Sequence, residues 1–238
     1  MSLFTRGAPE LPPPPASPAP LSPPNRRTPS TPGPGIPAAA GDDLARAGHL
    51  GRTVVETIGE VVAVRPDVAE LAAACLLSRG HLLIEDIPGV GKTLLAQVVA
   101  AAVGGTFHRI QGTSDLLPGD VTGSLVPDGE GLRLRFRPGP IFAHVVVFDE
   151  LNRTTPRTQS ALLEAAEEGT VTVDGHRHSL PQPFLLVATQ NPLEIAGTFR
   201  LGEGAIDRFA AVVTPGRAAF DDEVAVIAGR RGRRRLPD

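Results

Sequence analysis

"HLLIEDIPGVGKT", residues 81–93, joins a short apolar run to a glycine-rich turn that ends in Gly-Lys-Thr. A phosphate-binding P-loop has a glycine, four further residues and then Gly-Lys-Ser/Thr. Counting back from Gly91 places the first glycine at position 86, where the chain has Asp86. Because aspartate tolerates unusual turn conformations better than most residues, we interpret the stretch as a P-loop between a buried strand and a helix.

This loop suits a polyphosphate, because the backbone N–H groups of such a turn and of the following helix start converge on one anion. Lys92 is expected to contact the β- and γ-phosphates, and the Thr93 hydroxyl to bind Mg²⁺. Lys92 is the single lysine among 23 basic residues, and a narrow ammonium fits a tight loop better than a guanidinium does. The alternative is a plain strand–turn–helix connection in which Gly-Lys-Thr arises by chance. The predicted nucleotide-binding loop residues are Asp86, Ile87, Pro88, Gly89, Val90, Gly91, Lys92 and Thr93.

Composition argues against several other functions. The net charge of −3 and the absence of Trp and Tyr give no basic surface or stacking platform for nucleic acid. Cys75 is the only cysteine, which excludes an intrachain disulfide. No apolar run is long enough for a membrane span, and the proline-rich N-terminus lacks the apolar core of a secretory signal, so a cytoplasmic protein is expected. A GTPase is disfavoured, because the guanine-reading Asn-Lys-x-Asp motif needs a second lysine.

The chain divides into three parts by composition. Residues 1–41 hold 13 of the 25 prolines and no apolar periodicity, so we predict a disordered, proline-rich arm. Residues 42–215 alternate predicted helices and strands and form the expected core. Within it, helices are predicted from Asp42 or Asp43 onward and from Pro66 to a stop at Gly80. Residues 216–238 are expected to be a truncated lid remnant or a basic tail.

The strands predicted near residues 82, 145 and 184 are apolar on both faces, which indicates a parallel sheet covered by helices and hence an α/β fold. The segment 114–125 is expected to be a capped turn region. The segment 131–142 alternates apolar and arginine residues and predicts a half-exposed strand. Asp-Gly at 174–175, between two alternating runs, predicts a β-hairpin. His176 and His178 would share one face of that hairpin, where a plain hairpin surface is favoured over the start of a metal site.

Acidic residues follow the second apolar strand, "HVVVFDE". Asp149 and Glu150 are delivered to its carboxyl end, the edge at which open α/β sheets bind ligands. Asp149 is expected to belong to the nucleotide site and to hold Mg²⁺, and Glu150 to polarise the water that attacks the γ-phosphate. The alternative is an acidic pair that caps the next helix.

Two further segments carry candidate catalytic residues. "LLVATQNP" ends in Thr189 and Asn191, and Asn191 is a candidate to orient the attacking water, although Asn-Pro is also a common turn. "GAIDRF" places Arg208 after an acid near a short predicted helix. Arg208 is a candidate to stabilise the transferred phosphate in a neighbouring subunit, and a surface ion pair is the alternative.

Together these stretches resemble the MoxR group of AAA+ ATPases, the branch with an insertion in the second helix. The resemblance runs from about residue 54 to 215 and includes "RIQGTSDLLPGDVTGS", "DELNRTTPRTQSALLEAAEEGTVTVDG" and "GTFRLGEGAIDRF". It implies that Lys92 and Thr93 belong to Walker A, Asp149 and Glu150 to Walker B, and that Asn191 is sensor 1. It also implies that Arg208 is an arginine finger and Arg153 a further interface candidate.

The resemblance further implies ATP and Mg²⁺ as cofactors, a hexameric ring, and a protein client, often one with a von Willebrand A domain. The sequence departs from the group at "VVAVRPDV", where a Gly-Gln pair is usual beside adenine, and at "GEGA" ahead of Asp207. A helical lid with a sensor 2 arginine is expected to be largely missing. The favoured hypothesis is an ATPase that remodels a partner. The alternative hypothesis is an ATP-binding regulatory subunit with little hydrolysis of its own.

Overall fold

The computed structural model describes residues 38–62, 64–85, 92–129, 134–191 and 196–214. The predicted lid remnant, the first 37 residues of the predicted arm and the six loop positions Asp86 to Gly91 lie outside these ranges. So do Leu132 and Arg133 of the predicted alternating strand. The first helix begins at Ala38, a few residues before the Asp42 or Asp43 start that the sequence suggested.

The core is a five-stranded, fully parallel sheet with the strand order β2-β5-β8-β1-β9. This confirms the α/β fold and the three buried strands predicted from their apolar runs. All parallel strands end at the same edge, so the residues that follow β1, β5 and β8 are brought together. The strands are β1 (Leu82–Glu85), β2 (Phe107–Gln111), β5 (Val145–Asp149), β8 (Leu185–Gln190) and β9 (Ala211–Val213).

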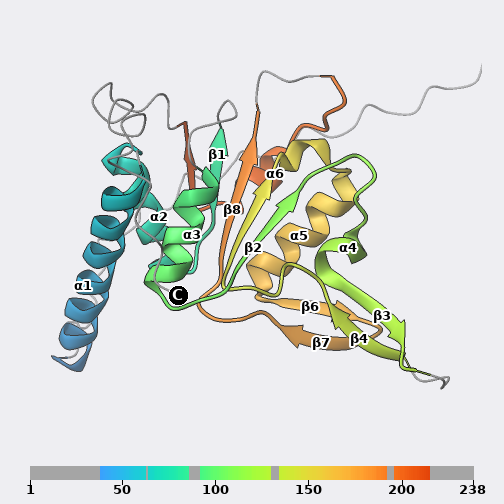
Figure 1. Ribbon diagram of the computed structural model, residues 1–238, viewed down its shortest axis with the longest axis horizontal. Helices are drawn as coiled ribbons and strands as arrows, with labels where there is room; N and C mark the ends of the chain where they lie inside the picture. The colour runs from blue at the N-terminus through green and yellow to red at the C-terminus, as the bar shows by residue number, and fades with distance from the viewer. Residues whose placement is uncertain (1–37, 63, 86–91, 130–133, 192–195, 215–238) are drawn as a thin grey trace, which may run out of the picture. The chain divides into compact units, whose positions relative to one another are not determined.

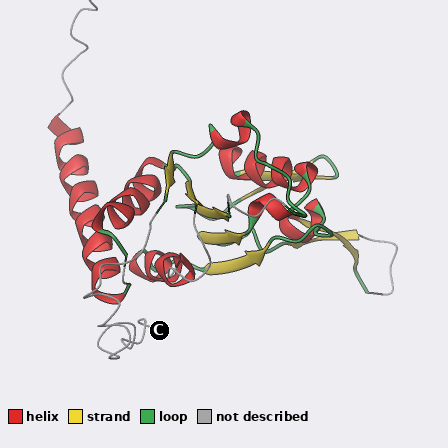
Figure 2. Ribbon diagram, turned by 90° about the horizontal axis from the view of Figure 1, so that it is seen from above, coloured by secondary structure: helices red, strands yellow, loops and turns green. Residues whose placement is uncertain are grey.

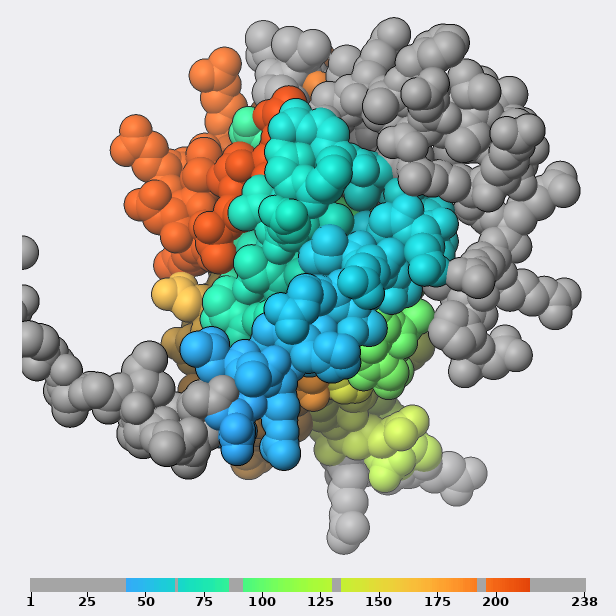
Figure 3. Space-filling view, turned by 90° about the vertical axis from the view of Figure 1, so that its left-hand side faces the viewer, coloured from blue at the N-terminus to red at the C-terminus, as the bar shows by residue number. Residues whose placement is uncertain are grey.

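Helices cover both faces of the sheet (Figures 1 and 2). On one face, α1 (Ala38–Val61), α2 (Pro66–Ser78) and α3 (Lys92–Ala102) pack against side chains such as Leu82 and Ile84. Figure 3 looks onto this face, where α1 (blue) and α2 (teal) form the outer surface. On the other face, α5 (Pro156–Glu168) and the short α4 (Pro118–Thr122) pack against Leu83 and its neighbours. Successive residues of β1 therefore enter opposite cores, which is why Leu82, Leu83 and Ile84 are all apolar.

The end of α2 differs from the prediction. The helix stops at Ser78, and Arg79 rather than Gly80 takes the left-handed conformation, with φ 56°. Gly80 is required for a different reason, because a Cβ atom there would lie 2.4 Å from the Cβ of Ala210. The glycine thus allows the start of β1 to pass close to the chain that enters β9.

Two antiparallel hairpins extend from this core. One pairs β3 (Gly123–Pro127) with β4 (Leu134–Pro138), and the other pairs β6 (Thr170–Val173) with β7 (His176–Ser179). The Asp174–Gly175 turn, with positive φ at both residues, confirms the hairpin predicted there. The predicted turn region 114–125 instead contains α4 and the start of β3. The rings of Phe136 and His178 stack with centroids 3.8 Å apart and join the two hairpins.

Two short elements complete the described chain. The 3-10 helix η1 (Leu151–Arg153) follows β5, and α6 (Glu203–Ile206) precedes β9. Within the described ranges, no helix combines the length and the apolarity that crossing a membrane requires.

Candidate active site

The carboxyl edge of the sheet gathers most of the predicted site residues that the structure describes. Lys92 and Thr93 open α3 just beyond the end of β1, and both side chains are half-buried. Asp149 ends β5, the second strand over from β1 in the sheet. The start of α3 places backbone N–H groups and the positive end of its dipole at this edge, which favours an anion. The loop positions Asp86, Ile87, Pro88, Gly89, Val90 and Gly91, which connect β1 to α3, fall in the part of the chain not described.

Asp149 is held by two neighbouring strands. Nε of Arg109, on β2, donates to Oδ2 of Asp149 at 2.6 Å. The hydroxyl of Thr189, on β8, donates to Oδ1 at 3.4 Å. The Asp149 side chain is only 13% exposed, and the charge-assisted bond from Arg109 together with the Thr189 hydroxyl provides a partner for each of its two oxygens.

Glu150 follows Asp149 in a left-handed backbone conformation, with φ 56° and ψ 50°. This region costs a non-glycine residue about 1–2 kcal/mol, so surrounding contacts must hold it. The Glu150 N–H donates to Oγ1 of Thr189 at 2.9 Å, and its carbonyl accepts from the Arg153 N–H at 2.9 Å. Oε2 of Glu150 also accepts from Nη1 of Arg153 at 3.1 Å. The acid is thus fixed at the sheet edge by β8 and by η1.

Asn191 lies directly beyond β8 and is half-buried. Its carbonyl accepts a hydrogen bond from Nδ2 of Asn152 at 3.3 Å, which ties the end of β8 to η1. Gln190 donates to Glu85 at 2.6 Å and ties the end of β8 to the end of β1. The segment expected to act as sensor 1 is therefore linked to η1, which follows Asp149 and Glu150, and to β1, which leads into the predicted phosphate loop.

Arg208 does not join this group within the chain. It lies between α6 and β9, where the chain enters a strand parallel to β1, so it is at the amino edge of the sheet. Its Nε donates to Oε2 of Glu167 at 2.7 Å, near the end of α5. The predicted finger is thus engaged in a surface ion pair, the alternative raised by the sequence, and it lies at the edge opposite Asp149 and Glu150.

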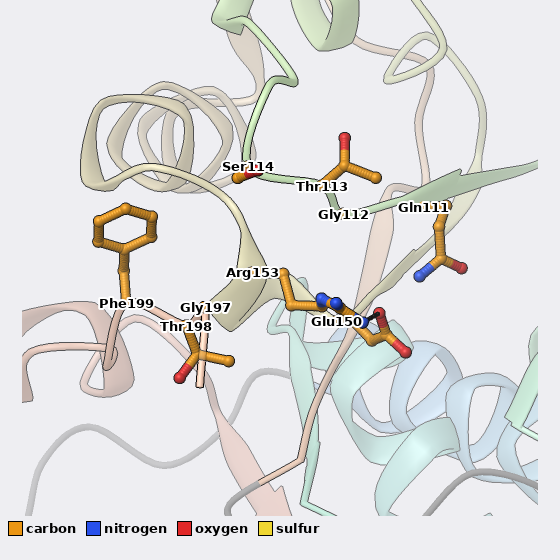
Figure 4. Close-up of a pocket in the computed structure, with 9 residues that line it drawn as sticks. All are labelled: Gln111, Gly112, Thr113, Ser114, Glu150, Arg153, Gly197, Thr198 and Phe199. Carbon is orange, nitrogen blue, oxygen red and sulfur yellow. Dashed lines mark hydrogen bonds and ion pairs between the residues drawn. The ribbon is translucent and has the colours of Figure 1, made fainter. Parts of the chain in front are cut away.

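A cavity of about 650 Å³ opens beside Glu150 (Figure 4). It lies between the segment that follows β2 and the segment at residues 197–199, with Arg153 and Glu150 on one wall. In Figure 4 the Phe199 ring and the Thr113 side chain lie on either side of this space. The remaining lining residues are Gln111, Gly112, Ser114, Gly197 and Thr198.

His178, His81 and Cys75 lie away from this edge. His178 stacks on Phe136, and no group of three or more metal-ligating side chains occurs among the residues described. His81 is 4% exposed, and burial lowers its pKa below the usual range despite the opposing influence of backbone carbonyls and Glu167. Burial raises the pKa of the Cys75 thiol, as expected for a structural cysteine.

Sequence reasoning missed Arg109. The residue lies in the stretch "RIQGTSDLLPGDVTGS", which contributed only to the family resemblance. The register explains its contact: Gln111 lies opposite Asp149, so Arg109, two residues earlier on the same face of β2, reaches the carboxylate diagonally. The sequence does contain an indication of this contact, because Arg109 is a long basic side chain in the strand that precedes the predicted acidic strand. The ion pair could be predicted from it only if β2 and β5 were already known to be neighbours in the sheet.

The chain is similar in sequence to known proteins. The sequence profile of the ATPase family associated with various cellular activities (AAA) matches residues 81–211. The chain is 49% identical over 179 residues to the uncharacterized protein YeaC of Bacillus subtilis, covering 75% of this chain and 56% of that protein. It is 36% identical over 191 residues to the chaperone MoxR1 of Mycobacterium tuberculosis, covering 80% and 51%.

A solved structure shows the same fold. The crystal structure of a candidate ATPase from Cytophaga hutchinsonii superposes with a TM-score of 0.69 at 30% identity, covering 84% of this chain and 61% of that one. The chain spans about half the length of the curated relatives it matches.

Proposed function

Because this chain belongs to the MoxR group of the AAA+ ATPases, we propose that it binds ATP with Mg²⁺ at the carboxyl edge of its sheet and hydrolyses it. The observation that carries the proposal is the convergence of Lys92, Thr93, Asp149 and Glu150 on that edge. A cation, a hydroxyl, a metal-binding carboxylate and a second carboxylate are the groups that phosphoryl transfer to water needs.

The available donors fit Mg²⁺, which prefers oxygen ligands and retains several waters. Thr93 would supply a hydroxyl and Asp149 a carboxylate. Bound Mg²⁺ would neutralise charge that develops on the phosphate oxygens. Asp149 is already the acceptor of Arg109 and Thr189, so its carboxylate is oriented before any ligand arrives.

Glu150 is proposed to take up the proton of the attacking water, and Asn191 to help orient that water. Arg208 lies at the opposite edge, so its proposed role is to reach the nucleotide of an adjacent subunit. That geometry supports a closed ring, and we propose a hexamer, in which each site combines residues from two copies. A protein client, with a von Willebrand A domain as the leading candidate, and a cytoplasmic location remain part of the proposal.

A second candidate function is an ATP-binding subunit with little hydrolysis of its own. The ion pair between Glu150 and Arg153 supports it, because Oε2 of Glu150 is already engaged by the guanidinium and would have to leave it before contacting the attacking water. In this case ATP would act as a regulatory ligand, and turnover would require a partner that separates the pair.

The two functions are separated by measuring phosphate release against protein concentration at saturating Mg²⁺–ATP. An enzyme that depends on fingers from neighbouring copies should show a specific activity that rises cooperatively with protein concentration. Tight ATP binding with no phosphate release at any concentration, alone or with a client, would support the regulatory function.

A further inference from the structure

The Thr189 hydroxyl lies between the two acids of the candidate site. Thr189 is 3% exposed, near the end of β8. Its Oγ1 accepts from the Glu150 N–H at 2.9 Å and donates to Oδ1 of Asp149 at 3.4 Å. One hydroxyl has one donor and two acceptor positions, so both bonds are compatible with each other. A single buried group therefore contacts the backbone of one acid and the carboxylate of the other.

The bond to the Glu150 N–H is important because of the backbone conformation there. Glu150 has positive φ, which directs its side chain differently from a regular continuation of β5. The preceding carbonyl, of Asp149, accepts from the Gly112 N–H at 2.7 Å. The peptide that joins Asp149 to Glu150 is thus held from β8 on its N–H side and from the segment after β2 on its carbonyl side.

Arg109 holds the second oxygen of Asp149. Its Nε lies 2.6 Å from Oδ2, while its Nη2 donates to Oε1 of Gln111 at 3.4 Å. The two carboxylate oxygens are therefore bonded to opposite neighbours, one to β8 and one to β2. Rotation of the carboxylate about its terminal bond would break both contacts.

We propose that Thr189 and Arg109 are positioning residues for the nucleotide–metal site, beyond the residues that the motif pattern assigns. Arg109 orients the metal-binding carboxylate of Asp149, and Thr189 orients both that carboxylate and the backbone of Glu150. The inference rests on the proposed ATP and Mg²⁺ site. Residues that hydrogen-bond to a metal ligand in this way typically change metal affinity or activity by about 10–100-fold when removed.

A purely structural role gives different expectations. If Thr189 only satisfies buried polar groups, its loss should lower thermal stability and leave the Mg²⁺ dependence of the folded protein unchanged. If the contact between Arg109 and Asp149 is only a surface ion pair, replacing Arg109 should leave nucleotide affinity unchanged both with and without Mg²⁺.

The Thr189 test uses two variants. Thr189→Val has nearly the same shape but lacks the hydroxyl, and Thr189→Ser keeps it. The affinity for a fluorescent ATP analogue is measured with Mg²⁺ and with excess EDTA, together with kcat and KM for ATP. For Thr189→Val, we expect kcat and the Mg²⁺-dependent gain in affinity to fall about 10–100-fold, with unchanged affinity in EDTA. Thr189→Ser should restore most of the loss.

The Arg109 test uses Arg109→Met, with Arg135→Met as its matched control. Arg135 also forms an exposed ion pair, with Asp128 at 3.5 Å, but it lies on the β4 hairpin. Arg109→Met should reduce the Mg²⁺-dependent gain in affinity about 10-fold or more, and Arg135→Met should leave it unchanged. Because Arg109 is half exposed, this variant is expected to fold even where Thr189→Val does not.

Three results would overturn the inference: wild-type Mg²⁺ dependence in Arg109→Met, wild-type kcat and Mg²⁺ dependence in folded Thr189→Val, or a Thr189→Ser variant as impaired as Thr189→Val. A wild-type protein that binds no ATP would contradict the proposed function itself. If the wild type binds and hydrolyses ATP, and Thr189→Val and Arg109→Met do so equally well, the proposed function stands and only the two positioning roles are contradicted.

Discussion

Nε of Arg208 donates a hydrogen bond to Oε2 of Glu167 at 2.7 Å, at the edge of the sheet opposite Asp149. Both side chains are exposed, and such surface pairs typically contribute about 0–1 kcal/mol to folding. The pair is therefore weak enough to open when a stronger anionic partner is offered. Within one chain Arg208 is at the wrong edge to meet the phosphates, so any catalytic role must be exerted on a neighbouring copy.

The first prediction separates a finger from a plain ion pair. Arg208→Ala should lower kcat by about 10³-fold or more, as loss of an arginine finger does, while ATP binding is retained. Glu167→Gln is the matched control, because it breaks the same pair and leaves the guanidinium in place. Its kcat should stay near that of the wild type. Equal losses in both variants would instead indicate that the pair matters only for structure.

A mixing experiment tests whether this role is exerted across subunits. Glu150→Gln supplies an intact Arg208, and Arg208→Ala supplies an intact Glu150. Mixed rings should contain some interfaces with both groups, so the mixture should hydrolyse ATP faster than either variant alone. Activity no higher than the average of the two variants would argue against a finger acting in trans.

The second prediction concerns Glu150. Replacement by Gln removes a proton acceptor without changing the shape of the side chain, so ATP affinity should be retained and kcat should fall about 10²–10⁴-fold. Calorimetric ATP binding and phosphate release measured on the same preparation provide the check. A variant that hydrolyses ATP at the wild-type rate would show that Glu150 is not the base.

The third prediction concerns Gly112, which packs closely against the backbone of Asp149 and Glu150. A Cβ atom at this position would lie 2.3 Å from the Glu150 carbonyl oxygen and 2.9 Å from that of Asp149. Gly112→Ala must therefore displace that backbone, and a shift of about 1 Å can reduce a rate about 10²-fold. Gly119→Ala is the control, because its Cβ would meet no atom within 4 Å. Equal kcat values for the two variants would contradict this prediction.

The fourth prediction is a pH dependence of stability from His81. Burial lowers its pKa in the folded state, so below about pH 6.5 the unfolded chain binds more protons than the folded one. Stability should fall as the pH drops through this range, by up to about 1.4 kcal/mol per pH unit from this one group. Urea unfolding of the wild type and His81→Gln at pH 7.5 and 5.5 measures the difference. A variant with the same pH dependence as the wild type would exclude His81 as its source.

The architecture was predictable because a strand that is buried on both faces of a sheet is apolar at consecutive positions of the sequence. The runs at 82–84, 145–148 and 185–188 are apolar throughout, and the structure places them in one parallel sheet. The Asp174–Gly175 turn was predictable for a similar reason, since few residue pairs accept positive φ at both positions.

Contacts between distant segments were less predictable. Arg109 and Asp149 are 40 residues apart, and only the pairing of β2 with β5 brings them together. The end of α2 was assigned to Gly80 by a local rule, whereas the structure uses Gly80 for close approach to Ala210 and bends the chain at Arg79. The conformational preference of a single residue does not indicate which distant segment of the chain will pack against it.

Equilibrium ATP binding to the wild type and to Lys92→Ala in the presence of Mg²⁺ tests whether the carboxyl edge of the sheet is an ATP site. Thermal unfolding of both proteins should establish that the variant is folded. We expect the wild type to bind ATP and folded Lys92→Ala not to bind it measurably. An unchanged ATP affinity in the variant would contradict the site assignment.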